Sequence, residues 1–149
     1  MKIYLAGPLF SVADQEWLRG LKHHIQGMEQ GGGTSLEVVW PHDLVAGEDT
    51  QAWGDQAKQM IFDRCKKHLD DADAVVALLD GAQVDDGTAW EIGYFHARRH
   101  PHQRILGIRT DFRNAGDVPG AKVNLMIDCT CDVIVHTVAG LLAELKKIL

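Results

Sequence analysis

The chain has 149 residues, of which 46% are hydrophobic and 24% charged, a composition that fits one compact domain and excludes both a disordered chain and a cleft between two domains. Because 15 Lys and Arg residues face 21 Asp and Glu residues, the net charge of −6 leaves no overall positive field to hold a nucleic-acid polymer. The longest strongly apolar run, residues 74–79, is far shorter than the roughly 20 residues that cross a bilayer, so no membrane contact is expected. Three cysteines without CxxC spacing favour a cytoplasmic protein without a disulfide framework.

Apolar periodicity in the first half of the chain predicts two strands and two helices. In chain order, these are a strand over 2–6, a helix over 11–30 ended by glycines 31–33, a strand over 36–40, a loop over 41–54 and a helix over 55–71. A connection as long as residues 41–54 is typical of a lid or a binding loop.

The second half continues the alternation of strands and helices. We expect a buried strand over 73–79, a turn over 81–87, a helix over 88–99, a strand over 104–109, a polar loop over 110–120, a strand over 133–135 and a helix over 137–148. Alternating elements of this kind predict a single α/β domain over residues 1–149, with a mostly parallel sheet of five strands.

The turn after the first strand is the first candidate site, because reactive groups in an open parallel sheet gather at the carboxyl ends of the strands. Gly7 would allow a ligand to approach the backbone closely. The segment from Tyr4 to Phe10 contains neither a GxGxxG pattern nor the lysine of a phosphate-binding loop. Taken alone, it is an ordinary strand-to-helix turn.

The second candidate is residues 85–93, where three carboxylates surround the start of a predicted helix. Asp85 or Asp86 can cap this helix, and Thr88 with Glu91 fits a capping box. Alternatively, a carboxylate held at a helix start stays ionised and can attack an electron-poor carbon. Both interpretations stand at this point, and Asp73, a fourth carboxylate, can simply solvate a strand edge.

A third group contains His96, His100 and His102. The first two have the spacing of a helical metal pair, but arginines surround them and the segment has no acidic or cysteine ligand. A solvated helix end with favourable positive charge explains this group better, so we predict neither a metal site nor a cofactor. Serine catalysis is not supported either, because neither Ser11 nor Ser35 lies in a GxSxG turn.

Four segments together resemble the nucleoside 2-deoxyribosyltransferase family. They are Tyr4 to Pro8, Asp70 to Asp73, Asp85 to Gly93, and Val123 to Met126. The resemblance implies a flavodoxin-like, doubly wound parallel sheet and a homo-oligomer, a dimer or larger, whose active sites form between subunits. It also implies the transfer of 2-deoxyribose between nucleobases with retention of configuration, with deoxynucleosides and free nucleobases as the small-molecule partners.

The resemblance also implies roles for particular residues. Glu91 would be the nucleophile that attacks C1′ of a deoxynucleoside, oriented by Tyr4. Asp85 would hold a sugar hydroxyl, and Asp73 would help move protons at a ring nitrogen of the base.

Other residues would complete the substrate site. Asn124 from a neighbouring subunit would bind the 5′-hydroxyl region, with Met126 against the sugar or base. Gly7 and Gly87 are further binding candidates by their place in the matching segments. Since bases need an apolar face to stack on, Phe10 and Trp53 are also candidates.

Two alternatives to the transferase stay open. Related enzymes hydrolyse N-glycosidic bonds of nucleosides or nucleoside 5′-monophosphates, although here the acidic pair at 85–86 would repel a phosphate. The same sheet could also serve a nucleotide-sensing module without catalysis. The preference between purines and pyrimidines is left open.

Overall fold

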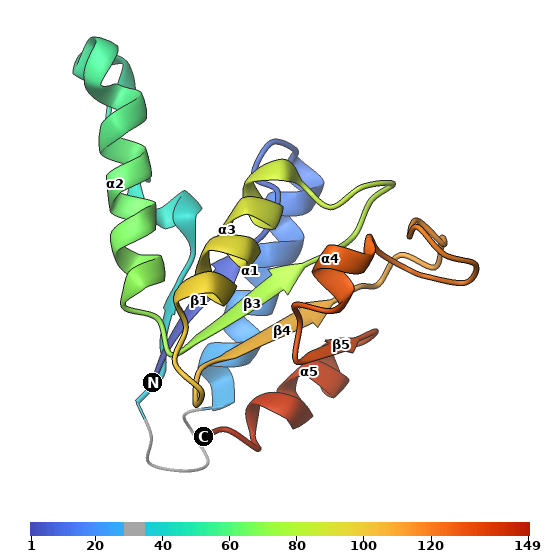
Figure 1. Ribbon diagram of the computed structural model, residues 1–149. Coiled ribbons are helices and arrows are strands. Elements are labelled where there is room, and N and C mark those ends of the chain that lie inside the picture. Colours follow the sequence, from blue (N-terminus) through green and yellow to red (C-terminus); the bar gives the residue numbers. More distant parts are fainter. Residues whose placement is uncertain (29–34) are drawn as a thin grey trace.

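Five short strands form one parallel sheet at the centre of the computed structural model, which describes residues 1–28 and 35–149 (Figure 1). The strands are β1 (Lys2–Ala6), β2 (Glu37–Val39), β3 (Ala74–Leu78), β4 (Arg104–Ile108) and β5 (Val133–Val135). Their order in the sheet is β2-β1-β3-β4-β5, and all four neighbouring pairs are parallel. This order is that of a flavodoxin-like doubly wound sheet, so the predicted fold class is confirmed.

Helices cover both faces of the sheet. They are α1 (Val12–Gln26), α2 (Ala57–Asp70), α3 (Asp86–Arg98), α4 (Leu125–Asp128) and α5 (Val138–Leu145), with the 3-10 helices η2 (Pro41–Leu44) and η3 (Thr50–Gln56). Ile3 and Leu5 pack in a core with α1 and α5, whereas Tyr4 and Ala6 pack in a second core with α2 and α3. Because successive side chains of a strand point to opposite faces, β1 sends Tyr4 toward α2 and α3.

Polar side chains cap α1, α3 and α5 in the same way, and the cap at Asp85 is one that the sequence predicts. Ser11, Asp85 and Thr137 each accept a hydrogen bond from the backbone N–H three residues further on. The predicted helix 11–30 ends its regular α-helical part at Gln26, and the predicted glycine stop at 31–33 lies outside the described residues.

Two segments differ from the sequence prediction. The predicted loop over 41–54 contains η2, which begins at Pro41, and most of η3, which begins after the capping side chain of Asp49, with a short turn between them. The four-residue helix α4 was not predicted because it is too short to show helical periodicity. Oδ1 of Asn124 accepts a hydrogen bond from the backbone N–H of Met126, and Oδ2 of Asp117 accepts one from that of Leu125.

The loops after β3 and β4 are tied together by the buried side chain of Arg109. Its guanidinium donates hydrogen bonds to the backbone carbonyls of Leu79, Gly81 and Arg113. These contacts fix the connection that leads into α3, and so they help to set where α3 begins.

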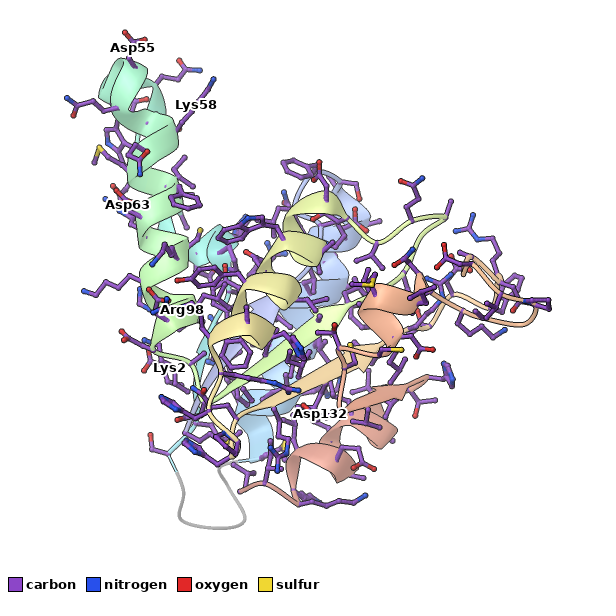
Figure 2. All side chains as sticks on the ribbon, viewed as in Figure 1. Lys2, Asp55, Lys58, Asp63, Arg98 and Asp132 are labelled. Carbon is purple, nitrogen blue, oxygen red and sulfur yellow. The ribbon has the colours of Figure 1, made fainter. Side chains whose placement is uncertain are left out.

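The start of α2 and the adjoining η3 project from the rest of the molecule (Figure 1). Asp55, Lys58 and Asp63 point into open space along this projecting end (Figure 2). None of the helices over residues 1–28 and 35–149 is long and apolar enough to cross a membrane.

Candidate active site

A hydrogen bond between β1 and α3 forms the centre of the site. The hydroxyl group of Tyr4 donates to Oε1 of Glu91 over 2.5 Å, and Tyr4 is completely buried. Asp85, not Thr88, caps α3, and the Thr88 hydroxyl donates back to the Asp85 carboxylate. The capping box between Thr88 and Glu91 is therefore wrong, and the Glu91 carboxylate faces the sheet.

The environment of Glu91 raises the pKa of its carboxyl group. Burial is the main cause, the negative charge of Asp85 adds to it, and the hydrogen bond from Tyr4 opposes it, with a resulting pKa of about 7. Glu91 is the sixth residue of α3, beyond the first turn in which the helix dipole acts. The expectation that the helix start keeps this carboxylate ionised is thus outweighed by burial.

The same burial, together with the charge of Glu91, raises the pKa of the Tyr4 hydroxyl far above its ordinary value. Tyr4 therefore stays neutral at every physiological pH and acts as a hydrogen-bond donor. Tyr4 bonds Oε1 of Glu91, and no residue in the described part of the chain hydrogen-bonds the other carboxylate oxygen, which can therefore meet a substrate.

The raised pKa of Glu91 predicts that the variant Glu91→Gln is more stable than the wild type at alkaline pH. The folded carboxyl group binds its proton more tightly than the unfolded one, so the free energy of unfolding falls as pH rises from about 4.5 to about 7. The loss is on the order of 3 kcal/mol, because one pKa unit corresponds to about 1.4 kcal/mol. Glutamine has no such charge to bury.

Thermal or denaturant unfolding of both proteins at pH 8 and pH 4.5 measures this difference. We expect the glutamine variant to unfold at the higher temperature at pH 8, and the gap to close at pH 4.5. A variant less stable than the wild type at pH 8 would contradict the burial of a charged Glu91.

A cavity of about 360 Å³ opens beside the Tyr4–Glu91 pair. Its walls come from β1, α2 and α3, and they include Tyr4, Phe62, Cys65, Gly87, Trp90 and Glu91. The rings of Phe62 and Trp90 meet edge to face with centroids 5.6 Å apart, and each side chain remains nearly half exposed, at 44% and 47%. A polar reactive pair thus lies beside an apolar, aromatic wall.

Sequence reasoning missed three of these wall residues. Phe62 and Cys65 have the three-residue spacing of one helix face, and Trp90 directly precedes Glu91. These spacings were visible, but only the packing of α2 beside α3 shows that both helices line one cavity.

Of the other predicted residues near this site, Gly87 lines the cavity and Asp85 acts on Glu91 through its charge. Gly7 does not line it. A Cβ atom on Gly7 would lie 2.9 Å from the methyl groups of Leu18, so this glycine permits close packing of the turn after β1 against α1.

Two predicted stacking residues lie outside the cavity walls. Phe10 is 87% exposed in the turn before α1. Trp53, on η3, packs under the guanidinium group of Arg64 at 4.7 Å from the ring centroid. The structure instead brings Phe62 and Trp90 to the Glu91 cavity.

Asp73 also lies away from the cavity walls. It is exposed just before β3, and its Oδ2 atom accepts a hydrogen bond of 2.7 Å from the backbone N–H of Lys2. This contact lies at the start of β1 and β3. It gives Asp73 a structural role at a strand edge, one of the two roles that the sequence left open.

Asn124 and Met126 line a different cavity, of about 640 Å³. It lies against the side of α3 that carries Ile92 and His96, whereas Gly87, Trp90 and Glu91 line the first cavity. Oδ1 of Asn124 accepts a hydrogen bond from the backbone N–H of Met126, whose side chain is 69% exposed. Within one chain, therefore, Asn124 and Glu91 do not share a cavity.

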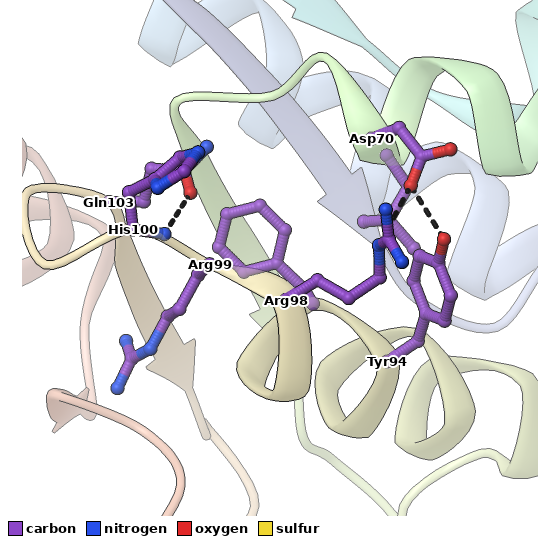
Figure 3. Close-up of a pocket in the computed structure, with 8 residues that line it drawn as sticks. Asp70, Tyr94, Arg98, Arg99, His100 and Gln103 are labelled. Carbon is purple, nitrogen blue, oxygen red and sulfur yellow. Dashed lines mark hydrogen bonds and ion pairs between the residues drawn. The ribbon is translucent and has the colours of Figure 1, made fainter.

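The histidine group lies around the end of α3 and the start of β4. A small polar pocket of about 120 Å³ lies there, and Figure 3 shows Tyr94 and Arg98 directed toward Asp70. Tyr94 donates a 2.6 Å hydrogen bond to Asp70, while the rings of His100 and His102 stack. No three His, Cys, Asp or Glu side chains gather to hold a metal ion in the part of the chain that the structure describes.

Comparisons with known proteins bear on the family and the fold of the chain. The family model described as nucleoside 2-deoxyribosyltransferase matches residues 3–126. A conserved protein from Enterococcus faecalis V583 is 27% identical, with a TM-score of 0.79 over 100% of this chain and 99% of that one.

Two more distant structures share the fold. A 2-deoxyribosyltransferase from Bacillus psychrosaccharolyticus is 18% identical, with a TM-score of 0.75 over 95% of this chain and 90% of that one. The CMP N-glycosidase of Clostridium botulinum is also 18% identical, with a TM-score of 0.52 over the whole of both chains.

Proposed function

The chain belongs to the nucleoside 2-deoxyribosyltransferase family, and we propose that it transfers 2-deoxyribose between nucleobases through a covalent deoxyribosyl ester of Glu91. Membership of this family indicates a deoxyribosyltransferase or a related N-glycosidase that acts on small nucleosides and nucleobases. The observation that carries the finer proposal is the hydrogen bond from Tyr4 to Glu91 beside a cavity with aromatic walls.

In the first half of the reaction, the free carboxylate oxygen of Glu91 attacks C1′ while the bond from C1′ to the base nitrogen breaks. The electron pair of that bond leaves with the base, and positive charge develops on the sugar. A carboxylate next to this charge stabilises the oxocarbenium-like transition state. Tyr4 holds the other carboxylate oxygen and so fixes the direction of attack.

In the second half, the ring nitrogen of an incoming base attacks C1′ from the opposite side and releases the Glu91 carboxylate. Two inversions at C1′ give net retention of configuration. The exposed end of the cavity, beside Phe62 and Trp90, allows one base to leave and another to enter without release of the sugar.

Trp90 and Phe62 provide the apolar face on which the nucleobase stacks in this proposal. We expect Trp90→Ala to raise KM for the deoxynucleoside about tenfold, because loss of a base-stacking ring costs about 1–3 kcal/mol. Trp90→Phe should restore most of the affinity. Steady-state kinetics of both variants measure the effect.

Trp53→Ala is the matched control, since it removes the same type of side chain from η3, outside the cavity walls. Equal KM values for Trp90→Ala and the wild type would show that the base does not stack on Trp90.

Hydrolysis is the second candidate function, because an N-glycosidase shares the fold. Its reported substrate class, a nucleoside 5′-monophosphate, fits this cavity less well. Lys66 in the cavity wall is already paired with Asp70 at 2.7 Å, and Asp85 and Asp86 lie near Glu91 in the sequence. A phosphate would meet more negative than unpaired positive charge.

Incubation with a deoxynucleoside and a different free base, followed by chromatography, separates these functions. We expect a new deoxynucleoside to form. Release of free base without a new nucleoside would indicate a hydrolase, and no change with purine and pyrimidine donors would favour a module without catalysis.

A further inference from the structure

The proposed transfer needs a proton donor for the departing base. A purine or pyrimidine that leaves C1′ carries the electron pair of the broken bond, and protonation of its ring nitrogen lowers the barrier. Asp73 does not line the cavity, and the Tyr4 proton is committed to Glu91. The lysine of the cavity wall is paired with Asp70. Within one chain, the candidates for this donor are the remaining wall residues.

Among the described residues of the wall, Cys65 is the one that remains with a transferable proton. It lies on α2, half-buried, in the same cavity as Glu91, and its side chain interacts with the Tyr4 hydroxyl. The indole N–H of Trp90 is far too weak an acid to protonate the departing base. Cys65 therefore joins the Tyr4–Glu91 pair on the side of the cavity that α2 provides.

Burial and the negative charge of Glu91 raise the pKa of the Cys65 thiol, so it is protonated at neutral pH before the reaction. Formation of the glycosyl ester removes the charge of Glu91. One of the two causes that hold the proton on sulfur is thus lost at the moment when the base departs.

We propose that the Cys65 thiol protonates the departing nucleobase and that its thiolate accepts the proton of the incoming one. This inference rests on the transfer reaction proposed above and names the acid and base of that reaction.

The steps balance in atoms and charge. In the first half, the C1′–N bond and the S–H bond break, while the bond from Glu91 oxygen to C1′ and an N–H bond of the base form. A neutral base leaves, and the negative charge moves from Glu91 to the Cys65 sulfur. In the second half, the incoming base gives its N–H proton to sulfur, its nitrogen bonds to C1′, and the Glu91 carboxylate is released. Neither an oxidant nor a reductant takes part.

A comparison of leaving groups tests this role. We expect Cys65→Ala to slow kcat with a natural deoxynucleoside about a hundredfold, the typical contribution of a general acid. The same variant should cleave p-nitrophenyl 2-deoxyriboside at a rate within about threefold of the wild type, because nitrophenolate leaves without a proton. Cys129→Ala, which removes an exposed cysteine outside the cavity walls, is the matched control.

If Cys65 only supported the fold or oriented Tyr4, its replacement would not distinguish between the two leaving groups. Equal slowing of Cys65→Ala with both substrates, or unchanged kcat with the natural one, would overturn the proposal. Melting temperatures of the variant and of Cys65→Ser show whether the cavity wall stays folded. If the wild type cleaves neither substrate, the transfer reaction itself fails, and this result is distinct from failure of the acid role.

Discussion

The variant Glu91→Gln should exchange bases at least about a thousandfold more slowly than the wild type, because the reaction path needs the nucleophile. Glutamine keeps the size of the side chain and an oxygen that can accept the hydrogen bond from Tyr4. The fold is therefore expected to survive, with the higher stability at alkaline pH that follows from the raised pKa of Glu91. Compared with the wild type at alkaline pH, the Glu91→Gln variant should therefore be less active but more stable.

Asp86→Asn is the matched control for this experiment. Asp86 lies on the same helix, is exposed, and accepts a hydrogen bond from the backbone N–H of Gly87. It should keep nearly full exchange activity. If the glutamine variant also retained near-wild-type exchange, Glu91 would have a structural role only, and the covalent mechanism would fail.

Mixing two inactive variants should restore activity if the sites are shared between subunits. We propose that Asn124 serves the Glu91 site of a neighbouring copy, because within one chain the two residues line different cavities. Glu91→Ala and Asn124→Ala should each be nearly inactive alone. When equal amounts are unfolded and refolded together, roughly a quarter of the sites receive both intact residues.

Asn124 also caps α4, so Asn124→Ser is the companion variant, since serine retains a capping oxygen. Size-exclusion chromatography checks that the mixture regains its oligomeric size. A mixture of the right size that stays as inactive as its parents would place both residues of a site on one chain. A monomeric wild type would also contradict the shared site.

The alternation of strands and longer helices could be read from the sequence because these elements carry local signals, and the family resemblance implied the flavodoxin-like sheet. The continuous apolar run of β3 reflects burial on both faces, and the caps of α1, α3 and α5 are short-range patterns. Helix α4 and the two 3-10 helices carry too few residues for such a signal. The family resemblance then pointed to Glu91 and Tyr4, which the structure joins by a hydrogen bond.

The walls of the cavity depended on tertiary packing and so could not be read from the chain. Residue spacing places Phe62 and Cys65 on one face of α2, but it cannot say that this face meets Glu91. For the same reason the sequence cannot separate Phe10 and Trp53, which lie outside the cavity walls, from aromatic side chains that line the cavity. The role of Asp73 in proton transfer came from the family resemblance, and its contact with Lys2 appears only when β1 and β3 pair.

Mass spectrometry of the wild-type protein after brief incubation with a deoxynucleoside alone tests the covalent mechanism most directly. We predict a mass increase of one deoxyribosyl group on the peptide that contains Glu91, which disappears when a second free base is added. The Glu91→Gln protein should show no such increase. Steady exchange of bases by a wild-type protein that never carries the group on Glu91, or that carries it on another residue, would contradict the mechanism.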